Sequence, residues 1–122
     1  MTKLLLGFVI VIVYSLSSCV YDNQEDLFPK EEECITIEMS YSIDILPILE
    51  THCLGCHSNE SNTGGVDMEG YEAVKIYVDN EAFAKSINHS SGTSPMPKNA
   101  EKLDDCTIQK IEAWIAQGAL DN

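Results

Sequence analysis

The sequence contains no arginine, so its seven basic residues are all lysines. Bidentate guanidinium contacts to phosphates or carboxylates are therefore excluded. The lysines are outnumbered by 20 acidic residues, which gives a formal net charge of −13. Nucleic acids and anionic membrane surfaces attract basic proteins, so this charge argues against both as partners. The P-loop and the G-x-G-x-x-G fingerprint are absent too, which removes these two nucleotide-binding motifs.

The chain does have the length and the apolar content for one folded domain. It has 122 residues, of which 44% are hydrophobic. This length fits one domain, and the hydrophobic content separates the chain from fully disordered sequences. We therefore expect a single small domain without internal repeats.

The N-terminus predicts a targeting segment. Lys3 precedes an apolar run, Leu4–Val13, which is shorter than the roughly 20 residues that span a bilayer. Such a run is typical of a secretory signal peptide. The sequence Leu16-Ser17-Ser18-Cys19 resembles a bacterial lipobox, which implies that residues 1–18 are removed and that Cys19 carries the lipid. The alternative is ordinary cleavage nearby, which would leave Cys19 as a free thiol.

An acidic segment follows the predicted cleavage site. Residues 19–33 are rich in carboxylates and show little apolar periodicity, so they cannot bury enough surface to fold alone. We predict a signal peptide at 1–18, an acidic flexible tether at 19–33 and a folded domain at 34–122. The protein would be exported and would lie on the periplasmic or cell-surface side, held to a membrane of a bacterium through Cys19.

The strongest motif in the sequence is Cys53-Leu54-Gly55-Cys56-His57. The C-x-x-C-H pattern is the covalent attachment site of c-type haem. Two thiols at this spacing can each bond one vinyl group of the porphyrin, and the histidine that follows can coordinate the iron. We therefore predict one covalent haem c, attached at Cys53 and Cys56, with His57 as the proximal ligand.

Two other sites compete for the same residues. A zinc ion could use Cys53, Cys56, His57 or His89, with Cys34 as a further ligand, although a second closely spaced ligand pair is missing. A redox dithiol of the thioredoxin kind would follow a strand, whereas an amphipathic segment precedes this motif.

The remaining cysteines of the folded part, Cys34 and Cys106, lie near its two ends. Exported proteins occupy an oxidising space in which leftover pairs usually form disulfides. We predict a Cys34–Cys106 disulfide from the compartment and the even number alone. The alternative is two buried free thiols.

A haem iron needs a sixth ligand or has an open site. The candidates are the other methionines and histidines of the folded part: Met39, Met68, Met96, His52 and His89. Met96 stands between Pro95 and Pro97, which fix an extended backbone. A methionine in such a polar loop is poorly placed for a hydrophobic core, so we predict Met96 as the distal ligand. His89 and an open site remain alternatives, and His52 is expected to point away from the iron.

The periodicity of apolar residues predicts helices in four places. The first helix would be capped by Ser42 or Asp44 and would run to about His52. Two short helices are expected at 71–77 and 81–88. The clearest helix begins at the cap Asp104 and ends at Gly118, with a buried face formed by Ile108, Ile111, Trp114 and Ile115. A short extended segment is expected at 35–39.

In this order of elements the chain resembles the small single-haem cytochromes c. The resemblance covers about Ile35–Asn122. It rests on residues 41–49 before the C-x-x-C-H motif, and on residues 65–71, 94–97 and 114–119. These segments are similar to lipoprotein-type cytochrome c domains of Bacteroidetes and Planctomycetes.

The resemblance implies an all-α, cytochrome c-like fold of about four short helices around the haem. It implies His57 as the proximal and Met96 as the distal ligand, with the first and last helices packed across each other. The chain departs from the family at Cys34 and Cys106, which the family pattern does not require. A second departure is Met68, where the family often has leucine, and this keeps Met68 open as a competing ligand.

His/Met ligation fills both axial positions, so we expect an electron carrier and not an enzyme. The acidic surface would attract redox proteins with a basic docking surface through weak, salt-sensitive encounters. The alternative is a haem-based sensor of small ligands, or a peroxidase-like domain, with an open or labile sixth position.

Overall fold

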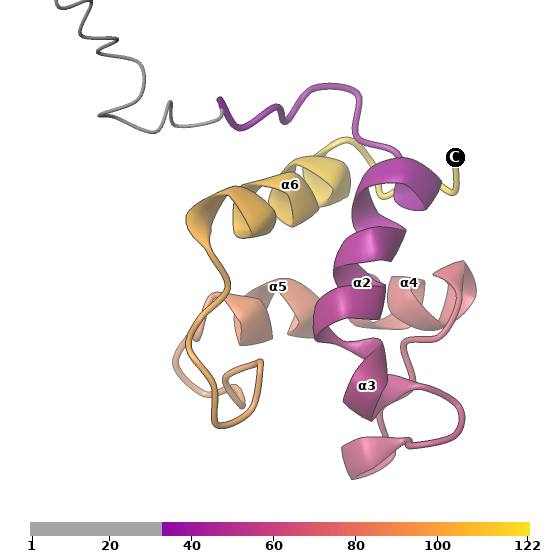
Figure 1. Ribbon diagram of the computed structural model, residues 1–122, viewed down its shortest axis with the longest axis vertical. Coiled ribbons are helices and arrows are strands. Elements are labelled where there is room, and N and C mark those ends of the chain that lie inside the picture. The colour runs from indigo at the N-terminus through magenta and orange to yellow at the C-terminus, as the bar shows by residue number, and fades with distance from the viewer. Residues whose placement is uncertain (1–32) are drawn as a thin grey trace, which may run out of the picture. The chain divides into compact units, whose positions relative to one another are not determined.

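Helices form the regular secondary structure of the part of the chain that the structure describes, residues 33–122. The structure is a computed structural model (Figure 1). Its elements are the π-helical turn η2 (Tyr41–Ile45), α2 (Leu46–His52), α3 (Leu54–His57), the 3₁₀ turn η3 (Thr63–Gly65), α4 (Tyr71–Asp79), α5 (Ala82–Ile87) and α6 (Asp105–Ala116). Residues 33–122 contain no strand, which confirms the expected all-α class. The predicted signal peptide, Cys19 and nearly all of the predicted tether lie outside these residues.

All four expected helical regions are helical. The short helix α3, which holds Leu54–His57 of the C-x-x-C-H motif, was not among the expected helices. Within residues 33–122, no helix combines the length and the apolar character needed to cross a membrane.

The first helix begins earlier than the sequence predicted. Its cap is Ser40, whose hydroxyl oxygen accepts a hydrogen bond from the backbone N–H of Ile43, while Asp44 accepts one from the backbone N–H of Ser40 at 2.8 Å. This reciprocal pair satisfies two backbone donors at the helix start. Ser42, a predicted cap, instead donates from its amide and its hydroxyl to the carbonyl of Asn122. That contact joins the two ends of the domain, so local sequence could not reveal it.

The last helix has the ends that the sequence predicted. Asp104 caps α6 by accepting hydrogen bonds from the backbone N–H and the hydroxyl of Thr107, at 2.9 and 2.6 Å. These bonds lower the pKa of the Asp104 carboxyl. At the other end Gly118 has a φ of +103°, and the N–H of Ala119 then bonds the carbonyl of Trp114 at 2.9 Å. This is the glycine-dependent helix end that the sequence indicates.

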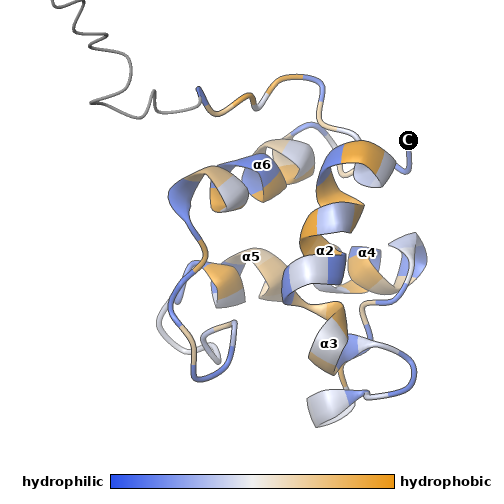
Figure 2. Cartoon of the chain, viewed as in Figure 1, coloured by the Kyte–Doolittle hydropathy of each residue, from blue (hydrophilic) through white to orange (hydrophobic). Residues whose placement is uncertain are grey.

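Trp114 lies at the centre of the hydrophobic core and is completely buried. Its ring centroid lies 5.7 Å from that of Tyr41, so the turn η2 packs against α6. Its indole N–H donates to the carbonyl of Leu120 at 3.0 Å. Ile115, expected on the buried face of α6, is only half-buried, because the face that meets the core runs through Ile108, Ile111 and Trp114. Figure 2 shows hydrophobic and hydrophilic residues alternating along the helices, as expected for amphipathic segments.

Residues 33–40 run beside α6 without forming a regular extended segment. The chain bends at Glu38, which has a φ of +52°. The side-chain amide of Gln117 holds this segment by accepting from the N–H of Met39 at 2.8 Å and donating to the carbonyl of Thr36 at 2.9 Å. These contacts satisfy backbone groups that a strand partner would otherwise bind, so the segment needs no sheet.

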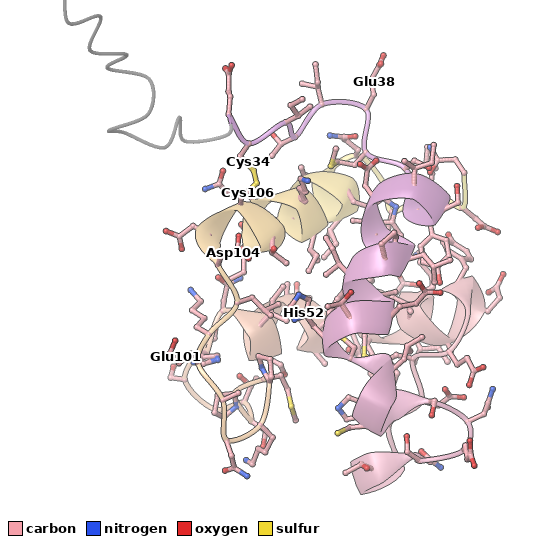
Figure 3. The ribbon with its side chains drawn as sticks, in the orientation of Figure 1. Cys34, Glu38, His52, Glu101, Asp104 and Cys106 are labelled. Atoms are coloured by element: carbon pink, nitrogen blue, oxygen red, sulfur yellow. A yellow bond between two sulfur atoms is a disulfide. The ribbon has the colours of Figure 1, made fainter. Side chains whose placement is uncertain are left out.

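Cys34 and Cys106 lie at disulfide-bonding distance, with their Cα atoms 5.5 Å apart. The pair joins the start of the domain to the first turn of α6 (Figure 3). Cys53 and Cys56 are the free cysteines of residues 33–122. The pairing expected from the sequence is therefore the one that the fold brings together.

Candidate functional site

A largely apolar cavity of about 570 Å³ lies beside the C-x-x-C-H motif. Its volume is within the range of small-molecule and cofactor sites, about 300–1,000 Å³. Its walls come from the end of α2, from α3, η3, the end of α4 and α5, and from the loop between α5 and α6. Cys53, Cys56, His57 and Met96 all line it. Four predicted site residues from two distant parts of the sequence therefore meet in one place.

One helical turn brings the three motif side chains to the same wall. Cys53 precedes α3 as its cap residue, and its carbonyl accepts the N–H groups of Cys56 and His57 at 3.1 and 3.0 Å. Residues three and four positions apart share one face of a helix. Both thiols and the imidazole accordingly line the cavity.

A backbone carbonyl orients the imidazole of His57. Its Nδ1 lies 3.2 Å from the carbonyl oxygen of Val66. A carbonyl can only accept a hydrogen bond, so Nδ1 is the donor, and in the neutral imidazole the lone pair then lies on Nε2. The same segment also binds the histidine backbone, since the N–H of Met68 donates to the His57 carbonyl at 2.7 Å. The two contacts therefore hold both the ring and the main chain of His57 in a defined orientation.

Met96 reaches the cavity from the long connection between α5 and α6. In Figure 1 this connection lies below α5 on the left, and α3 lies below α5 on the right. The N–H of Met96 donates to the carbonyl of Ser86 at 3.1 Å, and its carbonyl lies 3.1 Å from Nε2 of His89. The residue is half-buried. The flanking prolines are thus only part of what fixes its position.

The other methionines have different surroundings. Met68 also lines the cavity but is 6% exposed and belongs to the core. Its N–H donates to the His57 carbonyl, so its backbone lies beside that of the expected proximal ligand. Met39 is buried in the core and does not line the cavity. Met68 and Met96 thus both line the cavity, and Met96 as the distal ligand stays a prediction.

The two remaining histidines lie differently with respect to the cavity. His52 is one of the cavity-lining residues, exposed at the end of α2 (Figure 3). Its expected orientation away from the iron stays a prediction. His89, an alternative distal ligand, does not line the cavity, and its ring bonds the Met96 carbonyl instead.

The environment of Cys53 differs from that of a redox dithiol. Burial raises the pKa of the Cys53 thiol to about 11. Reactive C-x-x-C thiols have lowered pKa values, because the thiolate is the nucleophile. The motif also follows the helix α2 and not a strand. Both observations argue against the thioredoxin-like alternative.

The zinc alternative also lacks its ligands. Among residues 33–122 no three histidine, cysteine or carboxylate side chains are placed to hold a metal ion. Cys34 is paired with Cys106, and the His89 ring bonds a carbonyl. A haem iron takes only two protein ligands, so this observation bears on zinc and not on haem.

Several cavity residues could not be recognised from the sequence. Phe83 and Ile87, four positions apart on α5, form part of the apolar wall. Their spacing predicts a buried helix face, but it does not show whether that face packs against other core residues or lines a cavity. Lys98 is the one lysine or carboxylate residue on the cavity walls, although the described domain is strongly acidic.

Comparison with known proteins adds no further guide, since no family model, curated protein or solved structure matches the chain.

Proposed function

We propose that the chain is a single-haem cytochrome c that carries electrons. The observation that carries this proposal is the meeting of the Cys53, Cys56 and His57 side chains with Met96 in one apolar cavity. A haem c bound there would supply an iron that takes up and releases one electron. The residues present fit that group in number, in chemistry and in their placement around a cavity of suitable size.

Each residue has a distinct task in this proposal. The two thiols would hold the cofactor covalently, which matters in a domain too small to enclose it fully. The hydrogen bond from Nδ1 of His57 to Val66 leaves Nε2 as the ligand atom. Met96 would supply the thioether on the other side. The apolar walls would exclude water from the haem. The solvent around the haem would then rearrange little when the iron gains or loses an electron.

Ligands on both sides leave no position for a substrate, which favours an electron carrier over an enzyme. Methionine as the second ligand also raises the reduction potential. The apolar lining contains no carboxylate. Among the side-chain hydrogen bonds of residues 33–122, none joins a cavity-lining cysteine or serine to His52 or His57 as a nucleophile–base pair.

The location and the partner also belong to this proposal. A signal peptide at 1–18 and a lipid on Cys19 would place the domain on a membrane outside the cytoplasm, where haem attachment occurs in bacteria. The net charge of −13 would steer redox partners with basic docking surfaces, and the association rate would fall as the salt concentration rises.

Optical spectra test the proposal directly. The chain would be exported in a bacterium with haem-attachment machinery, and its oxidised and reduced spectra recorded after denaturing gel electrophoresis has shown whether haem stays bound. We expect covalent haem, sharp reduced bands and the weak far-red ferric band of methionine ligation. A double variant, Cys53→Ser with Cys56→Ser, is the control and should lose the covalent haem.

Two other results would change the proposal in different ways. Covalent haem that lacks the far-red band and binds CO readily in the ferrous state would support the ligand-sensor or peroxidase-like alternative. Wild-type protein that carries no covalent haem under these conditions would overturn the cytochrome proposal as a whole.

A further inference from the structure

The peptide groups of Met96 are held on both sides. Its N–H donates to the carbonyl of Ser86 at the end of α5, and its carbonyl accepts from Nε2 of His89, each at 3.1 Å. The first bond joins two backbones and does not depend on a side chain. Only the second bond needs a particular side chain, the imidazole of His89.

The backbone of His89 is shaped for this contact. His89 follows the last turn of α5 and has a φ of +55°, in the left-handed region. Its N–H closes the helix end by donating to the carbonyl of Ser86 at 3.1 Å. Non-glycine residues rarely adopt this conformation, although histidine does so more often than most. The left-handed residue turns the chain away from α5 and starts the loop that returns at Met96.

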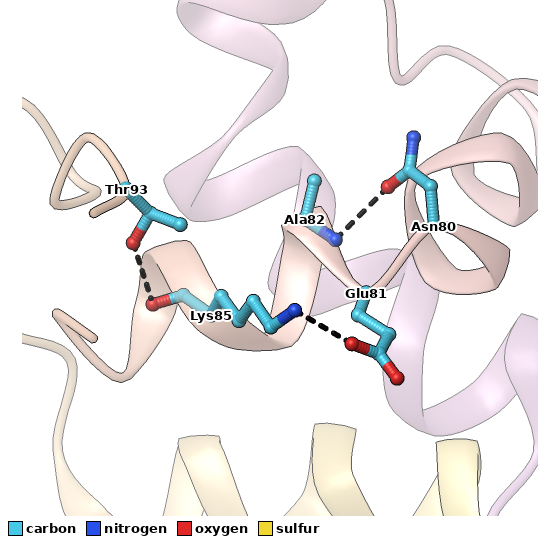
Figure 4. Close-up of polar contacts among 5 residues, drawn as sticks. All are labelled: Asn80, Glu81, Ala82, Lys85 and Thr93. Carbon is cyan, nitrogen blue, oxygen red and sulfur yellow. Dashed lines mark hydrogen bonds and ion pairs between the residues drawn. The ribbon is translucent and has the colours of Figure 1, made fainter. Parts of the chain in front are cut away.

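The intervening loop is tied to α5 as well. The hydroxyl of Thr93 donates to the carbonyl of Ser90 at 2.7 Å and also lies 3.3 Å from the carbonyl of Lys85 (Figure 4). The N–H of Ser90 donates to the same Lys85 carbonyl at 2.9 Å. These bonds hold the turn at the beginning of the loop. The return to Met96 is then fixed by the Ser86 and His89 contacts.

The imidazole of His89 has no other evident task. It is exposed, does not line the cavity and makes no second side-chain hydrogen bond within residues 33–122. Its contact with Met96 spans seven positions. An exposed ring could face solvent in many rotamers, and the contact selects one of them. The cost of that ordering is offset by the bond to the Met96 carbonyl.

We propose that His89 is a positioning residue for Met96. By holding the Met96 carbonyl, it fixes the direction of the side chain and keeps the thioether against the cavity. The imidazole can donate from Nε2 in its charged form and in one neutral tautomer, so the contact does not need a particular charge. This inference rests on the proposed function, because it assigns His89 to the stability of a His57/Met96 ligand pair.

The test uses the exported, haem-loaded full chain and four forms of it. These are the wild type, His89→Ala, His89→Gln, whose side-chain amide can supply a comparable donor, and Ser91→Ala as the loop control. Ser91 is exposed and makes no side-chain hydrogen bond within the described domain. The readouts are the intensity of the far-red ferric band, the affinity of the ferric protein for imidazole, and the thermal midpoint.

We expect His89→Ala to weaken the far-red band and to raise the affinity for imidazole about fivefold, the factor that about 1 kcal/mol for one hydrogen bond represents. His89→Gln should recover most of both effects, and Ser91→Ala should behave as the wild type. Recovery by glutamine would separate positioning from a general loss of stability, since the thermal midpoint alone would not distinguish them.

The outcomes that contradict the inference differ from those that contradict the proposed function. A wild type with the far-red band whose His89→Ala variant keeps the same band and imidazole affinity would overturn the positioning role alone. Equal changes in His89→Ala and Ser91→Ala would do the same. A wild type with haem but no far-red band would overturn Met96 ligation, and the role of His89 with it.

Discussion

Nδ1 of His57 lies 3.2 Å from the carbonyl oxygen of Val66, nine residues further along the chain. The segment that provides this carbonyl also donates a backbone hydrogen bond from Met68 to His57. The expected proximal ligand is therefore backed by one short segment that fixes both its ring and its main chain. Such outer contacts set the tautomer and the orientation of a ligating histidine.

This arrangement predicts that Met96 and Met68 respond differently to the same substitution. Met96→Leu should abolish the far-red ferric band and allow the ferrous protein to bind CO, because leucine has no ligand atom. Met68→Leu should keep the band and cost less than about 1.5 kcal/mol of stability, as a volume-conserving change in the core. Spectra of the two variants, measured beside each other, check this. Loss of the band in Met68→Leu alone would instead assign the distal role to Met68.

The two motif thiols should differ in reactivity before haem is attached. Cys56 is exposed, whereas burial raises the pKa of Cys53 to about 11 and keeps it protonated. In haem-free chain at pH 8, we expect iodoacetamide to label Cys56 well before Cys53, because only the thiolate reacts. The rate at Cys53 should go on rising up to about pH 11. Peptide mass spectrometry at several times measures both rates.

The control for this labelling is the same reaction in denaturant. Unfolding removes the burial that distinguishes the two sites, so both cysteines should then react at similar rates. Equal rates under native conditions would contradict the burial of Cys53 in the haem-free chain.

Two tyrosines of the core form a matched pair for stability measurements. The Tyr71 hydroxyl donates to the carbonyl of Ala119 at 2.9 Å, while the buried Tyr41 hydroxyl has no hydrogen-bond partner within residues 33–122. Tyr71→Phe should therefore lower the free energy of unfolding by about 1 kcal/mol. Tyr41→Phe should leave it unchanged or raise it, because an unpaired buried hydroxyl carries a desolvation cost. Denaturant unfolding of both variants tests this, and a larger loss in Tyr41→Phe would contradict it.

The disulfide between Cys34 and Cys106 should stabilise the domain without taking part in haem attachment. It closes a separation of 72 residues, for which the chain-entropy account gives up to about 4 kcal/mol. The double variant Cys34→Ser with Cys106→Ser should carry covalent haem and show an unchanged far-red band, but should unfold at a lower denaturant concentration. Counting the free thiols of the wild type with and without reductant shows whether Cys34 and Cys106 are oxidised to a disulfide.

Loss of covalent haem in that double variant would contradict the separation of the two cysteine pairs. Reactive thiols at Cys34 and Cys106 in the haem-free wild type under oxidising conditions would contradict the disulfide itself.

The parts of this protein that the sequence by itself determined depend on contacts between neighbours in the chain. The C-x-x-C-H spacing needs only one helical turn to place Cys53, Cys56 and His57 on one wall, and α3 provides that turn. The Asp104 cap and the Gly118 end of α6 likewise involve bonds across a few residues. Local geometry of this kind can be predicted from the sequence pattern, and the folded domain contains it.

Tertiary structure decided what depends on residues that are distant in sequence. Ser40 caps the first helix, while the predicted cap Ser42 bonds Asn122, about 80 residues away. Met68 and Met96 come to the same cavity from separate segments, and the pairing of His89 with Met96 depends on how the loop returns to α5. Such contacts form only when the core has brought the segments together, because the free energy that holds them comes from burial and not from local sequence.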